Sequence, residues 1–216
     1  MTPTPTLSLG LLLTASAGFI DVVGFIELGG YYTSFMSGNT TQLGASIAAG
    51  QIGAFLLPLS LIAMFILGSV IGSLLALVST RWGPSAVLGL VLAVLATALV
   101  LSLTGFSSAQ SMIVLASAAG AQNAILPAKG AARLGTTFVT GTLFAAGQDF
   151  ARALHRQAPR WRWLQHLLVW ASLLVGALLG ASAYAYWHLN ALAIPLLVYL
   201  ALLFVFSIRA PAKLLS

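Results

Sequence analysis

Long apolar runs separated by short polar breaks form the main pattern of this chain. Each run is close to the roughly 20 residues that a helix needs to cross a bilayer core about 30 Å thick. Runs of this length and apolarity predict transmembrane helices, so we expect an all-α polytopic membrane protein. The six runs cover approximately residues 7–28, 52–79, 85–103, 108–126, 163–187 and 191–208.

Two further segments carry small polar residues and glycines inside this otherwise apolar chain. They are versions of one sequence, because residues 33–44 recur 103 residues later as residues 136–147. Paired, interrupted segments in corresponding halves of a membrane protein indicate a transporter binding site. The matching positions are Thr33 and Thr136, Phe35 and Phe138, Gly38 and Gly141, and Gly44 and Gly147.

The repeat extends beyond these segments. Residues 17–21 align with residues 119–123, and the G-x-x-x-G stretch 68–72 aligns with the stretch 176–180. Three matches in the same order predict an internal duplication, in which each half contains a helix, an interrupted segment, a G-x-x-x-G helix and a further helix. Such glycines favour close helix packing, which we expect to occur within the chain. The repeats cover about residues 7–104 and 108–208.

Composition places the chain among integral membrane proteins. Of its 216 residues 60% are hydrophobic and 6% charged, and the mean hydropathy is +1.03. A soluble domain carries about 25% charged residues. We therefore expect one transmembrane domain over residues 1–216, with the first apolar run retained, since no basic segment of a signal peptide precedes it. The absence of cysteine excludes disulfides and Cys-ligated metal sites, and no cofactor is expected.

The basic residues predict the topology. If residues 33–50 and 136–152 each enter and leave the membrane on one side, six full crossings remain, and all nine basic residues and both termini are cytoplasmic. Each half then has three crossings, so the second half is inverted relative to the first. If both segments cross fully, Lys129 and Arg133 lie on the opposite side of the membrane from the four arginines of residues 152–162. Charge favours the inverted repeat with re-entrant segments, although 18 helical residues reach about 27 Å, nearly enough to cross.

Asp21 is the most informative polar residue, because it lies inside the first apolar run. A carboxylate in hydrocarbon is costly, so it faces the protein interior or a wet cavity and marks a functional site. The alternative is that Asp21 binds neighbouring hydroxyls or backbone amides and pins the fold. In the second half Asn123 occupies the position equivalent to Asp21, and Gln122 precedes it. One titratable group opposite a neutral amide suits proton coupling, whereas Asn and Gln also serve as interhelical glue.

The interrupted segments predict helix starts within the membrane. Ser, Thr and Asn are good N-caps and glycine permits the turn, and an exposed helix start favours an anionic or strongly polar ligand. The alternative is an unbroken helix whose hydroxyls bond their own carbonyls. The predicted substrate-binding residues are Asp21, Ser37, Gly38, Asn39, Thr40, Gln122, Asn123, Thr140, Gly141 and Thr142.

The remaining charged residues favour local roles. Glu27 lies beside a glycine pair where it can reach water, and Asp149 and Arg152 have the spacing of an ion pair on one helix face. The three histidines have no metal-ligand spacing, so no metal site is predicted. No hydrolase, P-loop or dinucleotide motif occurs in the chain, so we expect no enzyme, with catalysis inside the membrane left open.

The motifs at residues 17–21 and 35–40 resemble those of the YoaK-like family of bacterial membrane proteins, a domain of unknown function. Residues 122–124 and 140–143 are similar to its second signature. The resemblance covers essentially the whole chain and implies a small polytopic protein of the bacterial inner membrane. It implies signature positions but no substrate. Those positions here are Asp21, Gly38, Asn39, Gln122, Asn123 and Gly141.

Together these features predict a small-molecule transporter or channel-like permease for a polar or anionic solute, with proton coupling through Asp21. The rival interpretation is a structural or assembly protein, and an intramembrane enzyme comes third. The expected partners are the lipid bilayer and the solute, a homo-oligomer is left open, and positive-inside topology explains the basic pI of about 10.4 without nucleic acid.

Overall fold

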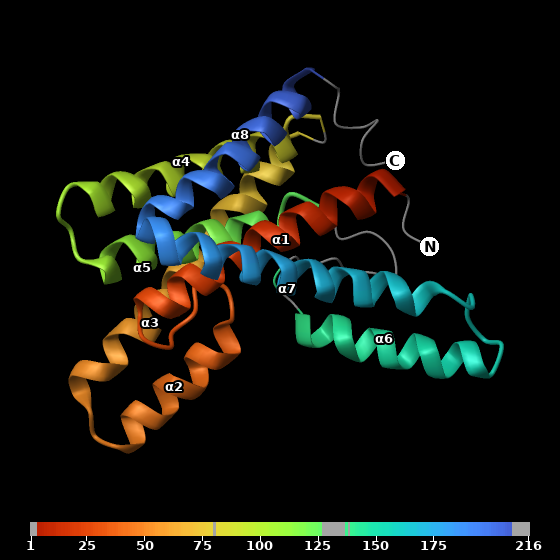
Figure 1. The fold of residues 1–216 in the computed structure, drawn as a ribbon, viewed down its shortest axis with the longest axis horizontal. Helices are drawn as coiled ribbons and strands as arrows, with labels where there is room; N and C mark the ends of the chain where they lie inside the picture. The colour runs from red at the N-terminus through yellow and green to blue at the C-terminus, as the bar shows by residue number, and fades with distance from the viewer. Residues whose placement is uncertain (1–3, 80, 127–136, 138, 209–216) are drawn as a thin grey trace.

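The computed structural model describes residues 4–79, 81–126, 137 and 139–208. Their helices follow the order of the predicted repeat, with four helices in the first half and four, plus one 3-10 turn, in the second (Figure 1). The first half contains α1 (Thr4–Glu27), α2 (Met36–Ala48), α3 (Ile52–Val78) and α4 (Gly83–Leu103). The second half contains α5 (Ser108–Gln122), α6 (Val139–Leu154), α7 (Arg162–Trp187), η1 (His188–Leu192) and α8 (Ala193–Ile208).

Local sequence explains where several helices begin and end. After α1 the chain turns through Gly29 and Gly30, whose φ angles of 64° and 110° are ones that glycine adopts readily. Helix α5 begins with a capping box. The Ser107 hydroxyl accepts from the backbone N–H of Gln110, and the side-chain oxygen of Gln110 accepts from the backbone N–H of Ser107. Pro84 lies in the first turn of α4, where its missing N–H costs nothing.

Helices α1 and α5 form the centre of the molecule. Leu13 and Val23 of α1 and Met112 and Leu115 of α5 are fully buried. Helix α1 packs most extensively against α7, and α5 packs most extensively against α3. Each central helix therefore has its main partner in the other half of the chain.

The G-x-x-x-G glycines make these contacts possible. A Cβ added to Gly68 would lie 1.9 Å from the Ser117 carbonyl oxygen, and one added to Gly176 would lie 1.9 Å from that of Ala15. Ala15 and Ser117 are equivalent residues of the two halves, 102 positions apart. The predicted packing within the chain is confirmed, since both glycine helices contact backbone of the central helices. The approach is too close for any side chain.

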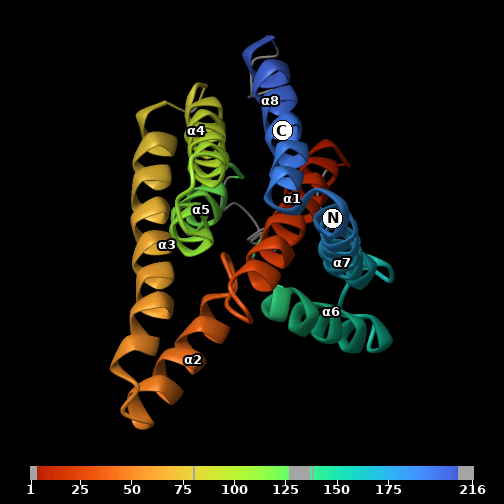
Figure 2. The same ribbon diagram turned by 60° about the vertical axis from the view of Figure 1, so that its left-hand side comes forward.

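Helices α2 and α6 lie outside this core. Each packs against the helix that follows it, α3 or α7. In both Figure 1 and Figure 2 the first turns of α2 and α6 lie near each other, and their other ends point apart. Figure 1 also shows that α1 and α5 run in opposite directions across the molecule, as do α3 and α7.

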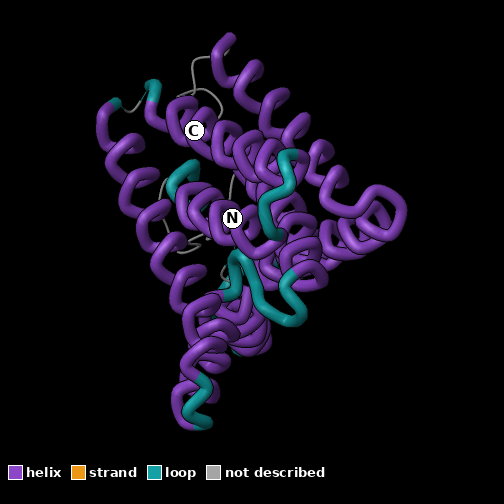
Figure 3. The backbone as a smooth tube through the Cα atoms, turned by 90° about the vertical axis from the view of Figure 1, so that its left-hand side faces the viewer, coloured by secondary structure: helices purple, strands orange, loops and turns teal. Residues whose placement is uncertain are grey.

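All regular structure in the described residues is helical, without strands (Figure 3). Four stretches are long and apolar enough to cross a membrane, and the last contains α7, η1 and α8 together. Helix α5 has 15 residues, or about 22 Å at 1.5 Å per residue, so length alone does not make it a crossing. The all-helical membrane class is confirmed, and six crossings stay a prediction. The stretches are Pro5–Glu27, Gly53–Val78, Gly83–Leu103 and Arg162–Ile208.

Replacing a contact glycine should separate the core helices. Gly176→Ala should lower the free energy of unfolding by about 3 kcal/mol, because the new methyl group meets backbone that cannot rotate away. The measurement is thermal unfolding in detergent micelles.

Gly89→Ala in α4 is the matched control, since nothing lies within 4 Å of its added Cβ. This change should be neutral or stabilise by up to about 1 kcal/mol through helix propensity. Equal melting temperatures for the two variants would contradict the described packing.

Candidate functional site

Asp21 ties the end of α1 to the segment that enters α2. Its Oδ1 accepts from the Thr33 hydroxyl at 3.0 Å and from the Ser34 backbone N–H at 2.7 Å. Both of these partners belong to the segment between α1 and α2. Asp21 therefore stabilises the fold through a neighbouring hydroxyl and a backbone amide, as one of the two sequence interpretations predicted.

Asn123 makes the corresponding attachment in the second half. The Asn123 Nδ2 lies 3.1 Å from the Thr137 hydroxyl oxygen, which is 3.3 Å from Asn123 Oδ1. Nδ2 also donates to the Ala119 carbonyl at 3.1 Å. Thr137 is the equivalent of Ser34. In both halves a polar side chain at an equivalent position thus holds the segment before the short helix, a carboxylate in the first half and an amide in the second.

Asn39 and Gly38 organise the start of α2. The buried Asn39 amide accepts from the Tyr32 N–H at 3.0 Å and donates to the Tyr32 carbonyl at 2.7 Å, which closes the loop before the helix. A Cβ on Gly38 would lie 2.6 Å from the Phe35 ring, so the missing side chain makes room for that ring. Both residues support local structure.

The predicted capping of α2 by Ser, Asn or Thr is wrong. The helix begins at Met36, after Phe35, and no side chain caps it. The Thr40 hydroxyl instead donates to the Met36 carbonyl at 2.8 Å, four residues back, because a hydroxyl already inside a helix bonds its own turn. Ser37 and Thr40 both remain exposed.

The start of α6 is more open than that of α2. Thr140 and Gly141 are exposed and Thr142 is half-buried. Nothing lies within 4 Å of a Cβ added to Gly141, in contrast to Gly38. The equivalent glycines therefore have different surroundings, although the helices begin at equivalent places.

Gln122 is buried at the meeting point of three helices. Its Nε2 donates to the Leu13 carbonyl of α1 at 2.9 Å, and its Oε1 accepts from the Tyr199 hydroxyl of α8. Gln122 is 2% exposed and Tyr199 is fully buried. Among the predicted site residues, Gln122 thus matches the interhelical-glue alternative.

A groove of about 570 Å³ lies between the end of α1 and the face of α2. Three rings border it, with Tyr32 5.0 Å from Phe25 and 5.2 Å from Phe35 between ring centroids. The Gln42 amide donates to the Gly30 carbonyl at 3.4 Å. Gly38 is the only predicted site residue in this groove's lining, which consists of Phe25, Gly30, Tyr32, Phe35, Gly38, Thr41, Gln42 and Ala45.

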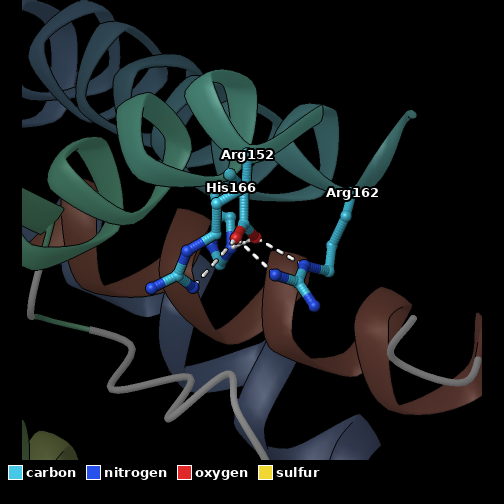
Figure 4. A network of polar contacts seen from close by, with 4 residues as sticks. Arg152, Arg162 and His166 are labelled. Atoms are coloured by element: carbon cyan, nitrogen blue, oxygen red, sulfur yellow. Dashed lines mark hydrogen bonds and ion pairs between the residues drawn. The ribbon is translucent and has the colours of Figure 1, made fainter. Parts of the chain in front are cut away.

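The strongest polar cluster of the described residues surrounds Asp149 of α6 (Figure 4). Arg162 of α7 donates to its two oxygens, from Nε at 2.6 Å and from Nη2 at 2.5 Å. The His166 Nε2 lies 3.2 Å from the carboxylate and the Arg152 Nη1 3.9 Å from it. The hydrogen bonds from Arg162 lower the pKa of Asp149, against the opposing effect of burial.

The sequence predicted Arg152 as the partner of Asp149 and missed Arg162 and His166. Arg152 is at a marginal distance, and its side chain is 53% exposed. The spacing rule considers one helix, whereas Arg162 comes from the next helix. An acidic residue beside four arginines was the signal that could have indicated a closer pair. Around Asp149 and through the rest of the described chain, no group of three acidic or histidine side chains could hold a metal.

Glu27 also has a partner from α7. It is half-buried and accepts a hydrogen bond from the Tyr184 hydroxyl. The Tyr184 ring packs edge-on against His188, with 5.5 Å between centroids. Glu27 therefore joins the end of α1 to the end of α7, a contact that the sequence interpretation of a water-facing residue did not include.

Comparison with known proteins identifies the family. The family model "Protein of unknown function (DUF1275)" matches residues 9–205. This chain belongs to the DUF1275 family. It is also similar to the UPF0700 transmembrane protein YoaK of Bacillus subtilis, with 30% identity over 94% of this chain and 92% of the relative. The UPF0700 transmembrane protein RA0705 of Rhizobium meliloti is 33% identical over 81% of this chain and 76% of the relative. The predicted YoaK-like resemblance is confirmed, and no solved structure matches.

Removing the charge of Asp149 should weaken the junction of α6 and α7. Asp149→Asn should lower the free energy of unfolding at neutral pH by about 2 kcal/mol, because the partly exposed Arg162 loses a charged acceptor. The lowered Asp149 pKa means that this contribution is fully present above the unfolded pKa of about 3.9 and is lost as the pH falls through the folded pKa. Chemical unfolding between neutral pH and acid should therefore show the difference closing only in acid.

Arg152→Gln is the matched control for the sequence-predicted partner. It should change the free energy of unfolding by no more than about 0.5 kcal/mol, because an exposed pair at this distance contributes little. A larger effect from Arg152→Gln than from Asp149→Asn would contradict the assignment of Arg162.

Proposed function

We propose that this DUF1275 protein is a small-molecule transporter or channel-like permease of the bacterial inner membrane, for a polar or anionic solute. The observation that carries the proposal is the convergence of α2 and α6, whose first turns lie near each other (Figures 1 and 2). The segment before each helix is held by a side chain at an equivalent position: Ser34 donates to Asp21 before α2, and Asn123 donates to Thr137 before α6. Helix starts carry unpaired N–H groups, which favour an anionic or polar ligand.

We propose that the two halves are an inverted repeat with six crossings, in which α2 and α6 are re-entrant and both termini are cytoplasmic. The opposite directions of α1 and α5 in Figure 1 support this arrangement. The equivalent contacts of Gly68 and Gly176 support it as well, since each central helix meets the glycine helix of the other half. An inverted repeat places its site where the halves meet.

In this proposal Asp21 carries a proton. Its Oδ1 accepts hydrogen bonds from the Thr33 hydroxyl and the Ser34 N–H. A proton on Oδ2 leaves both hydrogen bonds at Oδ1 in place, so the site can change charge without losing its attachment. Asn123 is neutral at every pH, which restricts the coupling to one half.

The contacts divide the predicted binding residues into two groups. Asn39 and Gln122 make hydrogen bonds within the protein, so we assign them a structural role and not contact with the solute. The exposed Ser37, Thr40 and Thr140 are the groups that we propose to meet the solute. The internal bonds also favour a second candidate, a structural or assembly protein without transport. We propose neither enzymatic activity nor nucleic-acid binding.

Proton coupling predicts a specific loss in Asp21→Asn. The amide oxygen can still accept from the Ser34 N–H, and Asn123 shows that an amide at the equivalent position can hold the segment before its short helix, through the Thr137 hydroxyl, so the protein should fold. In proteoliposomes loaded with a pH dye, the wild type should acidify the lumen when one member of a panel of small organic and inorganic anions is added. The variant should lose this response.

Glu27→Gln is the matched control, since Glu27 is the other carboxylate of α1 and is paired with Tyr184. It should retain proton movement. An unchanged pH response in Asp21→Asn would remove Asp21 from the coupling role. Failure of the wild type to move any anion would favour the structural protein.

Topology is tested by introducing single cysteines, for which the chain offers no background because it contains none. The inverted repeat predicts that Tyr31→Cys is periplasmic and Ala131→Cys is cytoplasmic. A membrane-impermeant maleimide should therefore label only the first in intact cells and both after lysis. Labelling of both positions from the same side would refute the inverted arrangement.

A further inference from the structure

The turn between α6 and α7 displays unneutralised positive charge. Residues 149–162 contain four arginines and one acidic residue, Asp149. Asp149 is 6% exposed and binds Arg162 through two hydrogen bonds, so its charge is directed inward. Arg152, Arg156 and Arg160, which we call the arginine cluster, are exposed. Among the described residues neither Arg156 nor Arg160 forms an ion pair.

Local hydrogen bonds hold the backbone of this turn in place. The Gln157 N–H donates to the Arg152 carbonyl at 2.8 Å, and the Arg156 N–H donates to the Ala153 carbonyl at 3.1 Å. The Trp163 indole N–H donates to the Arg160 carbonyl at 3.0 Å. The Arg160 guanidinium lies 5.3 Å from the centroid of the Trp161 ring. The cluster is therefore presented on an ordered turn.

An exposed apolar stripe of α6 leads up to these arginines. Leu143, Phe150 and Leu154 lie on one side of the helix, at spacings of seven and four residues, and Leu154 is 69% exposed. Phe150 packs edge-on against Trp163, with 5.2 Å between ring centroids. The apolar side chains lie along α6 and the arginines lie at its C-terminal end and in the following turn. This order matches the hydrocarbon and headgroup layers of a lipid leaflet.

We propose that the arginine cluster binds the phosphate of an anionic phospholipid, with the acyl chains along the apolar stripe of α6. Positive charge provides the selection against zwitterionic lipid, and an arginine can donate two hydrogen bonds to a phosphate. A soluble anion would satisfy the arginines but would make no contact with the exposed side chains of Phe150 and Leu154. The adjoining apolar stripe therefore favours a lipid over free phosphate. This surface is separate from the proposed transport site.

The test is calorimetric titration of the detergent-solubilised protein with dihexanoyl-phosphatidylglycerol and with dihexanoyl-phosphatidylcholine. Phosphatidylglycerol should bind and phosphatidylcholine should not. Arg156→Gln with Arg160→Gln should weaken binding about 25-fold, since each basic residue near an anionic lipid surface contributes about five-fold. The corresponding double lysine variant should retain binding within about three-fold, because the charge is kept.

Arg81→Gln is the matched control. Arg81 is an exposed arginine 5.1 Å from the Trp82 ring centroid, so it shares the Arg160–Trp161 geometry without the cluster. It should leave lipid binding unchanged. Equal binding of the two lipids, undiminished binding by the double glutamine variant, or full competition by inorganic phosphate at equal concentration would each overturn the proposal. The last result would assign the cluster to free anions.

Discussion

Backbone contact between two glycine helices and two central helices is the constraint on which the structure depends. Lipid is as apolar as a leucine side chain, so apolar area alone does not drive helices together inside a bilayer. The association must come from close van der Waals contact, and Gly68 and Gly176 bring helices near enough for carbonyl groups to meet Cα atoms. The position of α2 and α6 follows, because each is attached to one helix of these pairs.

The two halves keep this framework and differ in their polar residues. The first half attaches α2 through the Asp21 carboxylate and has a buried Ser46 near the end of α2. The second half attaches α6 through the Asn123 amide and has Asp149 at the position equivalent to Ser46. Charge therefore lies at the start of one short helix and at the end of the other. The two short helices at equivalent positions therefore have chemically different surroundings.

The sequence predicted the repeat, the helical class and the close packing of the glycine stretches, because each leaves a local pattern. It could not identify the partner of each glycine helix, since Gly176 and Ala15 are far apart in the chain. The partners of Gln122 could not be predicted for the same reason, because Leu13 and Tyr199 are 109 and 77 residues away in the chain. The capping prediction failed because it considered side-chain preferences alone, whereas α2 begins at Met36, where the rings of Phe35 and Tyr32 lie against Gly38.

The exchange of helices between the halves means that neither half is complete alone. A protein made of the first half alone would present α1 without α7 and α3 without α5, and so would leave both glycine contacts unmade. Two copies of such a half could complete each other by swapping these partners. In the present chain the two halves are linked covalently, so equivalent positions need not carry the same residue, as Asp21 and Asn123 show.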